Sequence, residues 1–151
     1  RLILADGLCY VEKFYKPDVM IDVATLTGAC SHALGPFFSA LMTQDEELME
    51  KLPKLGKLTG DRIWPLPLDD DFKPANKSNI ADISNCGSSA YTAGVITAGF
   101  FLKEFVEKAR WAHIDIGGTS NDVPVVSYLG NGKGSAGAFV RLLIEFVLGA
   151  K

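Results

Sequence analysis

Apolar residues recur along the chain at helical and strand-like spacings in turn. Leu4, Leu8, Val11 and Phe14 recur every three or four positions and predict an amphipathic helix. A short run of apolar and β-branched residues at 19–26 predicts a strand that is buried on both faces. No Ser, Thr, Asp or Asn stands before the helix as a cap, so we expect the chain to be cut from a longer one.

The middle of the chain predicts a second strand and a short helix. The strand covers 37–43, and an amphipathic helix covers 44–52 until Pro53 interrupts or ends it. Residues 60–74 are rich in proline and aspartate, and they predict an irregular segment that crosses the fold.

The last part of the chain begins with a polar, glycine-bearing loop at 84–94. The helix that follows has one apolar face, formed by Val95, Ala98, Gly99, Leu102, Phe105 and Val106. A buried strand is predicted at 111–116, and 124–130 is a possible further strand. The final element, 138–148, is apolar nearly all round and is therefore expected in a core or an interface.

Strands and helices alternate along the whole chain. This order is typical of the α/β class, in which helices cover both faces of a largely parallel sheet. We therefore predict a three-layer α/β/α architecture. With 151 residues, the chain fits one domain of ordinary size.

Composition and charge narrow the range of partners. Apolar residues make up 48% and charged residues 22% of the chain, which is typical of an ordered globular protein. The net charge of −3 disfavours a nucleic-acid partner, whose binding surface is normally basic. No apolar run approaches the roughly 18 residues of a membrane span, so we expect no membrane partner.

Three cysteines, Cys9, Cys30 and Cys86, are widely spaced and odd in number. They form neither a CxxC motif nor a Cys/His cluster with zinc spacing, which favours a reducing compartment such as the cytoplasm. We expect all three to be small buried hydrophobic residues.

The most informative pattern for function is shared by the two buried strands. Each strand holds a single acid, Asp22 or Asp115, and each ends in small residues, "ATLTGA" at 24–29 and "GGTS" at 117–120. Ligands of open α/β sheets bind beyond the carboxyl ends of the strands, and glycine there lets a ligand approach the backbone. The two stretches are therefore candidate walls of one pocket, or simply turns between strands and helices.

Other chemical signals are weak. His113 lies on a strand beside Trp111 and Asp115, and no acid or nucleophile is placed to make a triad with it, so it is interpreted as a core residue. The match to G-x-G-x-x-G at 132–137 lacks the second strand and the acid of a dinucleotide site. Neither a set of metal ligands nor a pair of nucleophile and base is apparent in the sequence.

Several stretches resemble one family in their order and spacing. They are "RLILADGL", "DVATLTGA", "TGDRIWPLPL", "SNIADISN", "TAGVITAGFFLKEF" and "WAHIDIGGT". The chain is similar over nearly its whole length to the leucine aminopeptidases, or cytosol aminopeptidases, which are two-metal exopeptidases. Arg1 is similar to the Arg that closes their hallmark, Asn-Thr-Asp-Ala-Glu-Gly-Arg.

The resemblance implies that the chain, 1–151, is the C-terminal portion of a catalytic domain. The hallmark's Asp and Glu are metal ligands and would precede Arg1, as would the remaining ligands, a Lys and further Asp residues. This chain would then contain no metal ligand, and its sheet would be incomplete at the N-terminal side. The isolated chain would be inactive.

The resemblance also implies cofactors and substrate contacts. Two divalent ions, zinc or manganese, would activate a water, and Arg1 would hold a bicarbonate that serves as general base. Seven residues match the family's substrate-contacting positions: Thr25, Leu26 and Gly28; Gly117 and Ser120; Asn85 and Cys86. Thr25, Gly28, Gly117 and Ser120 would line the pocket for the first side chain, and Leu26 would offer backbone groups to the substrate and the bicarbonate. Asn85 and Cys86 would contact the residue after the scissile bond.

The implied activity is removal of N-terminal residues, leucine-type, from peptides in the cytoplasm. The implied partners are peptide substrates, the upstream part of the same enzyme and further copies in a homo-hexamer. The family often has Ala at the position of Gly117 and a larger apolar residue at that of Ser120, which implies a roomier pocket here. The alternatives are a non-catalytic scaffold or interaction module and an unrelated nucleotide-binding α/β domain.

Overall fold

A computed structural model describes residues 1–120 and 134–149 and has a mixed sheet at its centre. The described strands are β1 (Val19–Ala24), β2 (Ser39–Thr43), β3 (Ile63–Pro65) and β4 (Arg110–Asp115), in the spatial order β1-β4-β2-β3. β1 runs parallel to β4, β2 runs parallel to β3, and β2 is antiparallel to β4. The possible strand at 124–130 lies outside the described residues.

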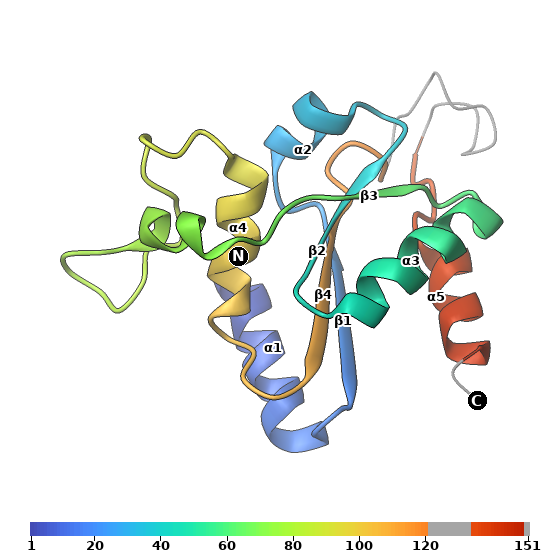
Figure 1. The fold of residues 1–151 in the computed structure, drawn as a ribbon, viewed down its shortest axis with the longest axis horizontal. Coiled ribbons are helices and arrows are strands. Elements are labelled where there is room, and N and C mark those ends of the chain that lie inside the picture. Colours follow the sequence, from blue (N-terminus) through green and yellow to red (C-terminus); the bar gives the residue numbers. More distant parts are fainter. Residues whose placement is uncertain (121–133, 150–151) are drawn as a thin grey trace.

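Helices cover both faces of this sheet (Figure 1). The helical elements are α1 (Leu2–Tyr15), α2 (Gly28–Leu34), α3 (Glu46–Thr59), the 3-10 helix η1 (Asp70–Asn76), α4 (Gly94–Lys103) and α5 (Val140–Leu148). α1 and α4 lie on one face, and α3 and α5 lie on the other. Each face has its own apolar cluster, one around Phe101 and Trp111 and the other around Leu41 and Ile114. The predicted α/β class and its three layers are confirmed.

The strand predicted at 19–26 forms as β1, but it is not buried on both faces. Only Met20 and Asp22 of this strand are fully buried, while Val19, Ile21 and Val23 are half-buried. The reason is its position: β1 is an edge strand of the described sheet, so fewer elements cover it than cover the inner strands.

The expectation that Pro53 interrupts or ends a helix at 44–52 is wrong. α3 begins after Asp45 and continues through Pro53 to Thr59. A proline inside a helix removes one backbone hydrogen bond and costs about 3 kcal/mol. Burial of Leu48 and Leu52, two leucines on the face of α3 toward the sheet, offsets that cost.

Two other boundaries differ from the predictions. The segment 60–74 is not irregular throughout, because β3 pairs with β2 and η1 begins at Asp70. α4 ends at Lys103, so Phe105 and Val106 lie in the turn that follows it rather than on the helix. Every residue of α4 from 95 to 102 is buried, so the helix packs on all sides and not through a single apolar face as predicted.

The final helix is only partly in the core. In α5, Leu142 is fully buried against the second cluster. Four further apolar residues of α5 are more than half exposed in the described structure: Val140, Ile144, Val147 and Leu148. No helix in the described part of the chain has the length and apolarity needed to cross a membrane.

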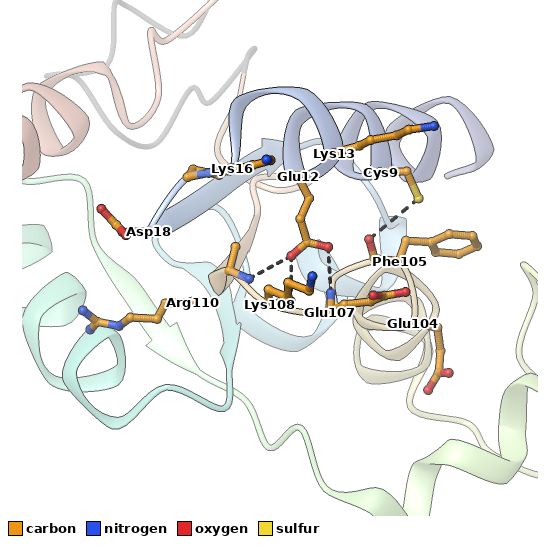
Figure 2. Close-up of a pocket in the computed structure, with 12 residues that line it drawn as sticks. Cys9, Glu12, Lys13, Lys16, Asp18, Glu104, Phe105, Glu107, Lys108 and Arg110 are labelled. Carbon is orange, nitrogen blue, oxygen red and sulfur yellow. Dashed lines mark hydrogen bonds between the residues drawn. The ribbon is translucent and has the colours of Figure 1, made fainter.

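The carboxylate of Glu12 joins α1 to the turn before β4. It accepts hydrogen bonds of 2.9, 2.8 and 2.8 Å from the backbone N–H groups of Glu107, Lys108 and Ala109, as Figure 2 shows. Desolvation raises the pKa of Glu12, but these hydrogen bonds outweigh it and leave the pKa below its ordinary value. The contact ties the last turns of α1 to the amino end of β4.

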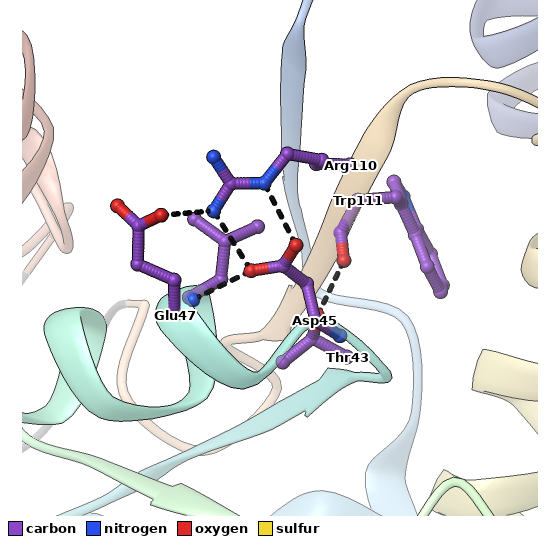
Figure 3. A network of polar contacts seen from close by, with 6 residues as sticks. Thr43, Asp45, Glu47, Arg110 and Trp111 are labelled. Atoms are coloured by element: carbon purple, nitrogen blue, oxygen red, sulfur yellow. Dashed lines mark hydrogen bonds and ion pairs between the residues drawn. The ribbon is translucent and has the colours of Figure 1, made fainter.

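A second polar network holds the start of α3 to β4 (Figure 3). Asp45 caps α3, because its Oδ1 accepts a hydrogen bond of 2.8 Å from the backbone N–H of Leu48. The guanidinium of Arg110 donates to both carboxylate oxygens of Asp45, at 2.7 and 2.9 Å, and to Glu47 at 2.9 Å. The hydrogen bond from Arg110 is the main reason that the pKa of Asp45 falls to about 2.

We expect Asp45 to make the stability of the chain depend on acid pH. Its native carboxylate binds protons less readily than the unfolded one, whose pKa is near 3.8, so its contribution is complete above that value. The contribution is lost as pH falls toward 2. Urea unfolding followed from pH 5 to pH 2 should show a smaller loss of stability in Asp45→Asn than in wild type.

Glu47→Gln is the matched control, since it changes an exposed partner of the same Arg110 and leaves the α3 cap intact. Equal pH dependence in wild type and Asp45→Asn would contradict the assignment. Replacing Asp45 by Ala should also cost about 1 kcal/mol at neutral pH through loss of the cap.

Candidate functional site

The two candidate pocket walls lie side by side. β1 and β4 pair in parallel, with Ala24 opposite Asp115, so the segments that follow both strands leave the sheet at the same edge. The first segment carries Thr25, Leu26 and Gly28 and leads into α2. The second carries Gly117 and Ser120. This adjacency is what two walls of one pocket require, and it is equally compatible with the alternative of two turns that follow neighbouring strands.

The carboxylate of Asp115 hydrogen-bonds to both walls. Its Oδ1 accepts from the backbone N–H of Leu26 at 3.1 Å, of Thr27 at 3.4 Å and of Gly117 at 3.0 Å. Its Oδ2 accepts from the hydroxyl of Thr27 at 2.7 Å. Asp115 is 0% exposed, and a buried carboxylate is stable only with such partners.

Sequence reasoning noted Asp115 only as the lone acid of its strand and did not assign it a role. The presence of only one acid in this buried strand was the signal that could have assigned it a role, because a buried carboxylate needs hydrogen-bond donors, and these are found where the strand ends. Which loops supply the donors depends on the pairing of β1 with β4, and the sequence alone does not show it.

Two glycines let the walls approach closely. A Cβ on Gly117 would lie 2.2 Å from the carbonyl oxygen of Thr27, and one on Gly118 would lie 2.5 Å from that of Gly35. Both distances are shorter than any real Cβ contact, so a side chain at either position requires the backbone to move. The resemblance leads one to expect Ala at position 117. Gly117 lacks the Cβ of that Ala, so the second wall can lie closer to the carbonyl of Thr27.

Thr27 also determines where α2 begins. Its hydroxyl accepts a hydrogen bond of 3.1 Å from the backbone N–H of Cys30, which is the usual capping contact. The same hydroxyl donates to Asp115, so one side chain connects the helix start to the second wall. Neither α2 nor this cap was expected from the sequence.

Arg1, Asn85 and Cys86 form a second group. The guanidinium of Arg1 donates a hydrogen bond to the backbone carbonyl of Asn85. Ser84 supports this loop, since its hydroxyl donates to the carbonyl of Cys86 at 2.8 Å and its backbone N–H donates to Asn76 at 2.8 Å. The sequence-predicted Arg and the sequence-predicted loop are thus in direct contact.

The first turns of α4 lie between the two groups. A Cβ on Gly87 would lie 2.8 Å from the hydroxyl of Thr97, so the loop that follows Cys86 packs on α4. A Cβ on Gly94 would lie 3.3 Å from the Cβ of Ala29, so α4 also packs on α2. Within the walls, Thr25 and Gly28 are exposed to solvent, as is Cys86 in the loop.

The arrangement offers binding groups rather than a reactive centre. It brings together a guanidinium, backbone groups of two loops and an exposed thiol. In the part of the chain that the structure describes, no group of three or more His, Cys, Asp or Glu residues is placed to hold a metal ion. A separate cavity of about 1060 Å³ lies at the amino ends of β1 and β4, away from these residues.

The interpretation of His113 needs one correction. The residue is buried, as expected, but an acid does lie beside it: Nδ1 is 2.5 Å from Oδ1 of Asp22. Oδ2 of Asp22 accepts from Nε1 of Trp111 at 2.7 Å. The pairing follows from register, because Asp22 and His113 are opposite each other in β1 and β4.

The cysteines differ in exposure, which corrects the expectation that all three are buried. Cys9 and Cys86 are exposed, whereas Cys30 is fully buried. The Cys30 thiol donates to the carbonyl of Asp115 at 3.2 Å. Burial, followed by the charge of Asp115, raises its pKa to about 11.

We therefore expect two of the thiols to react fast with a disulfide reagent and one to react slowly. With a disulfide reagent at pH 8, Cys9 and Cys86 should react at once, and Cys30 only after the chain unfolds, because burial and a high pKa suppress its thiolate. Cys86→Ser should remove one fast equivalent, and Cys30→Ser should remove the slow one. Three equally fast thiols would show that α2 does not pack as described.

Comparison with known proteins identifies close relatives. The model of the family described as "Cytosol aminopeptidase family, catalytic domain" matches residues 1–144. The "Probable cytosol aminopeptidase" of Geobacter sp. (strain M21) is 50% identical over 147 residues, which are 97% of this chain and 29% of that protein. The protein of the same name from Geotalea uraniireducens is 45% identical over 151 residues, 100% of this chain and 30% of the relative.

A third relative, from Acidithiobacillus ferrooxidans, is 49% identical over 148 residues, 98% of this chain and 28% of that protein. It carries the same name, "Probable cytosol aminopeptidase". The chain thus spans less than a third of the length of these curated relatives.

Proposed function

The chain belongs to the cytosol aminopeptidase family, and on that premise we propose that it is the C-terminal portion of the catalytic domain of a metal-dependent aminopeptidase. The enzyme would remove N-terminal residues, leucine-type, from peptides. All 151 residues would belong to this one domain, with the substrate-pocket walls as their contribution to it.

The observation that carries the proposal is the junction of the two walls at Asp115. This carboxylate holds Leu26 and Gly117 at the same edge of the sheet. In the proposed enzyme, Thr25 and Gly28 form one side of the pocket for the first side chain, Gly117 and Ser120 form the other, and Leu26 offers backbone groups to the substrate and the bicarbonate. Asn85 and Cys86 contact the residue after the scissile bond.

Arg1 is proposed to hold a bicarbonate ion, and its surroundings fit an anion. Its planar guanidinium matches a carbonate edge and stays charged at all relevant pH values. Arg1 also stands directly before α1, at the N-cap of a helix of 14 residues with no acid in its first turn, so the helix dipole favours an anion there. Bicarbonate bound there would supply a general base.

Two divalent ions, zinc or manganese, complete the proposed enzyme. The described residues do not form a metal site, so the proposal assigns the metal ligands to the part of the relatives that precedes the matched segment. Such ions lower the pKa of a bound water and polarise a carbonyl. This chain's own residues would bind and orient the peptide beside them.

The proposed partners are peptide substrates, the upstream part of the enzyme and further copies in a homo-hexamer, all in the cytoplasm. Exposed apolar residues on two helices are compatible with surfaces that the upstream part of the enzyme or further copies would cover. They are Ile3, Tyr10 and Phe14 on α1, and Val140, Ile144, Val147 and Leu148 on α5. The same exposure fits the alternative of a non-catalytic interaction module.

The proposal is tested on the complete gene product that contains this chain. Purified protein should hydrolyse leucine p-nitroanilide when manganese or zinc is added, and a chelator should stop the reaction. An N-acetylated leucine anilide is the control substrate, since an aminopeptidase requires the unblocked amino group. Absence of turnover with either metal, in a folded assembly, would instead support the non-catalytic module.

A further inference from the structure

We propose that Asp115 is a positioning residue for the peptide substrate. Its carboxylate would keep the backbone of Leu26 and of Gly117 in one fixed relation, so that the two pocket walls act as a single unit. The proposal rests on the proposed aminopeptidase function, because the substrate is assigned to these walls on that basis.

The hydrogen bonds themselves support this role. One oxygen of Asp115 accepts from the N–H groups of both walls, Leu26 at 3.1 Å and Gly117 at 3.0 Å. The other accepts from the hydroxyl of Thr27 at 2.7 Å, which in turn caps α2. A shift of either wall therefore disturbs the same carboxylate.

The glycine contacts make the arrangement stiff. A Cβ on Gly117 would lie 2.2 Å from the carbonyl oxygen of Thr27, so the walls are too close to each other for any side chain at position 117. With attraction through Asp115 and steric contact at Gly117, each wall restricts the other. Small errors in such a distance matter, because misplacing a reacting group by about 1 Å costs on the order of 100-fold in rate.

Asp115→Asn preserves the shape of the side chain, and it tests whether the negative charge and the two acceptor oxygens of the carboxylate are needed. The amide oxygen of the variant can still accept from Leu26 and Gly117, but its NH₂ group faces the Thr27 hydroxyl, which can no longer donate to it. That hydroxyl already accepts from the N–H of Cys30 and has one more lone pair for the new NH₂ group, but its own proton loses the carboxylate oxygen that accepted it.

The first measurement is steady-state kinetics of the complete gene product with leucine and alanine anilides. For Asp115→Asn we expect kcat/KM for leucine to fall about 10- to 100-fold and the preference of leucine over alanine to shrink, since the pocket wall is displaced. Thr27→Val should reproduce this loss of preference, and Thr27→Ser, which keeps the hydroxyl, should restore most of it.

Asp61→Asn is the matched control. Asp61 is also a buried acid, 4% exposed, and it accepts from Arg141 at 2.9 Å and from the backbone N–H of Leu142 at 3.1 Å. It lies beside α5 rather than at the pocket walls. This variant should lose stability while keeping the ratio of kcat/KM for leucine and alanine.

Hydrogen exchange gives a readout that does not need activity. In Asp115→Asn the amides of Leu26, Thr27 and Gly117 should lose part of their protection together, because a neutral amide oxygen accepts hydrogen bonds more weakly than a carboxylate, while the amide of Leu142 keeps its protection. Unchanged protection, or an unchanged leucine preference in both Asp115→Asn and Thr27→Val, would overturn the proposal. If the wild-type protein shows no turnover, the aminopeptidase function fails, and the exchange result still decides whether Asp115 joins the walls.

Discussion

The 151-residue chain by itself is expected to release no measurable product from leucine p-nitroanilide, with or without added manganese. The proposed chemistry needs metal ions that lower the pKa of a bound water toward neutrality, and the proposal assigns their ligands to residues before the matched segment. The described residues provide walls, a guanidinium and a thiol, and the proposal assigns these groups to holding the peptide, not to activating water.

The measurement compares the isolated chain with the complete gene product under identical metal concentrations. Intact mass is recorded on the same sample, because a heavier species would reveal a second fragment that travels with the chain. Metal-dependent turnover by a single 16.3 kDa species would contradict the prediction and would mean that a ligand set in this chain has been overlooked.

The second large effect is expected at Arg1. In the complete gene product, Arg1→Ala should lower kcat by about 100- to 10,000-fold, the usual contribution of a general base, because the bicarbonate would lose its guanidinium partner. KM should change much less, since the pocket walls remain in place. The kcat of Arg1→Lys should lie between those of wild type and Arg1→Ala, because an ammonium keeps the charge but lacks the planar fork of a guanidinium.

Arg110→Lys is the control for a general effect of changing an arginine. Arg110 pairs with Asp45 and Glu47 at the amino end of β4, the opposite end of the strand from the pocket walls. Its substitution should reduce stability slightly and leave kcat unchanged. If Arg1→Ala retains kcat within twofold of wild type at the same limiting bicarbonate concentration, Arg1 is not the anion-binding group.

The elements that the sequence predicted well are those with a strong local pattern. The apolar residues of α1 recur at helical spacing, and the apolar runs that form β1 and β4 are short and rich in β-branched or aromatic residues. Both strands are also followed by small residues, which correctly indicated where the strands end. These features depend on neighbours in sequence and so are visible without the fold.

The predictions failed where distant contacts outweigh local preference. A proline normally ends a helix, but the buried leucines of α3 keep that helix intact through Pro53. β3 has only three residues and forms because β2 offers it an edge. The expectation of an isolated His113 failed because Asp22 reaches it through strand register.

By itself, the sequence determined the α/β class, the family and the positions of the candidate walls, because these depend on local spacing and on short motifs. Only the tertiary structure decided that Asp115 joins the walls and that Arg1 meets the loop of Asn85. Those pairs are 84 or more residues apart, except the pair of Asp115 and Gly117. A buried carboxylate must be hydrogen-bonded, but which N–H groups it meets is set by the parallel pairing of β1 with β4.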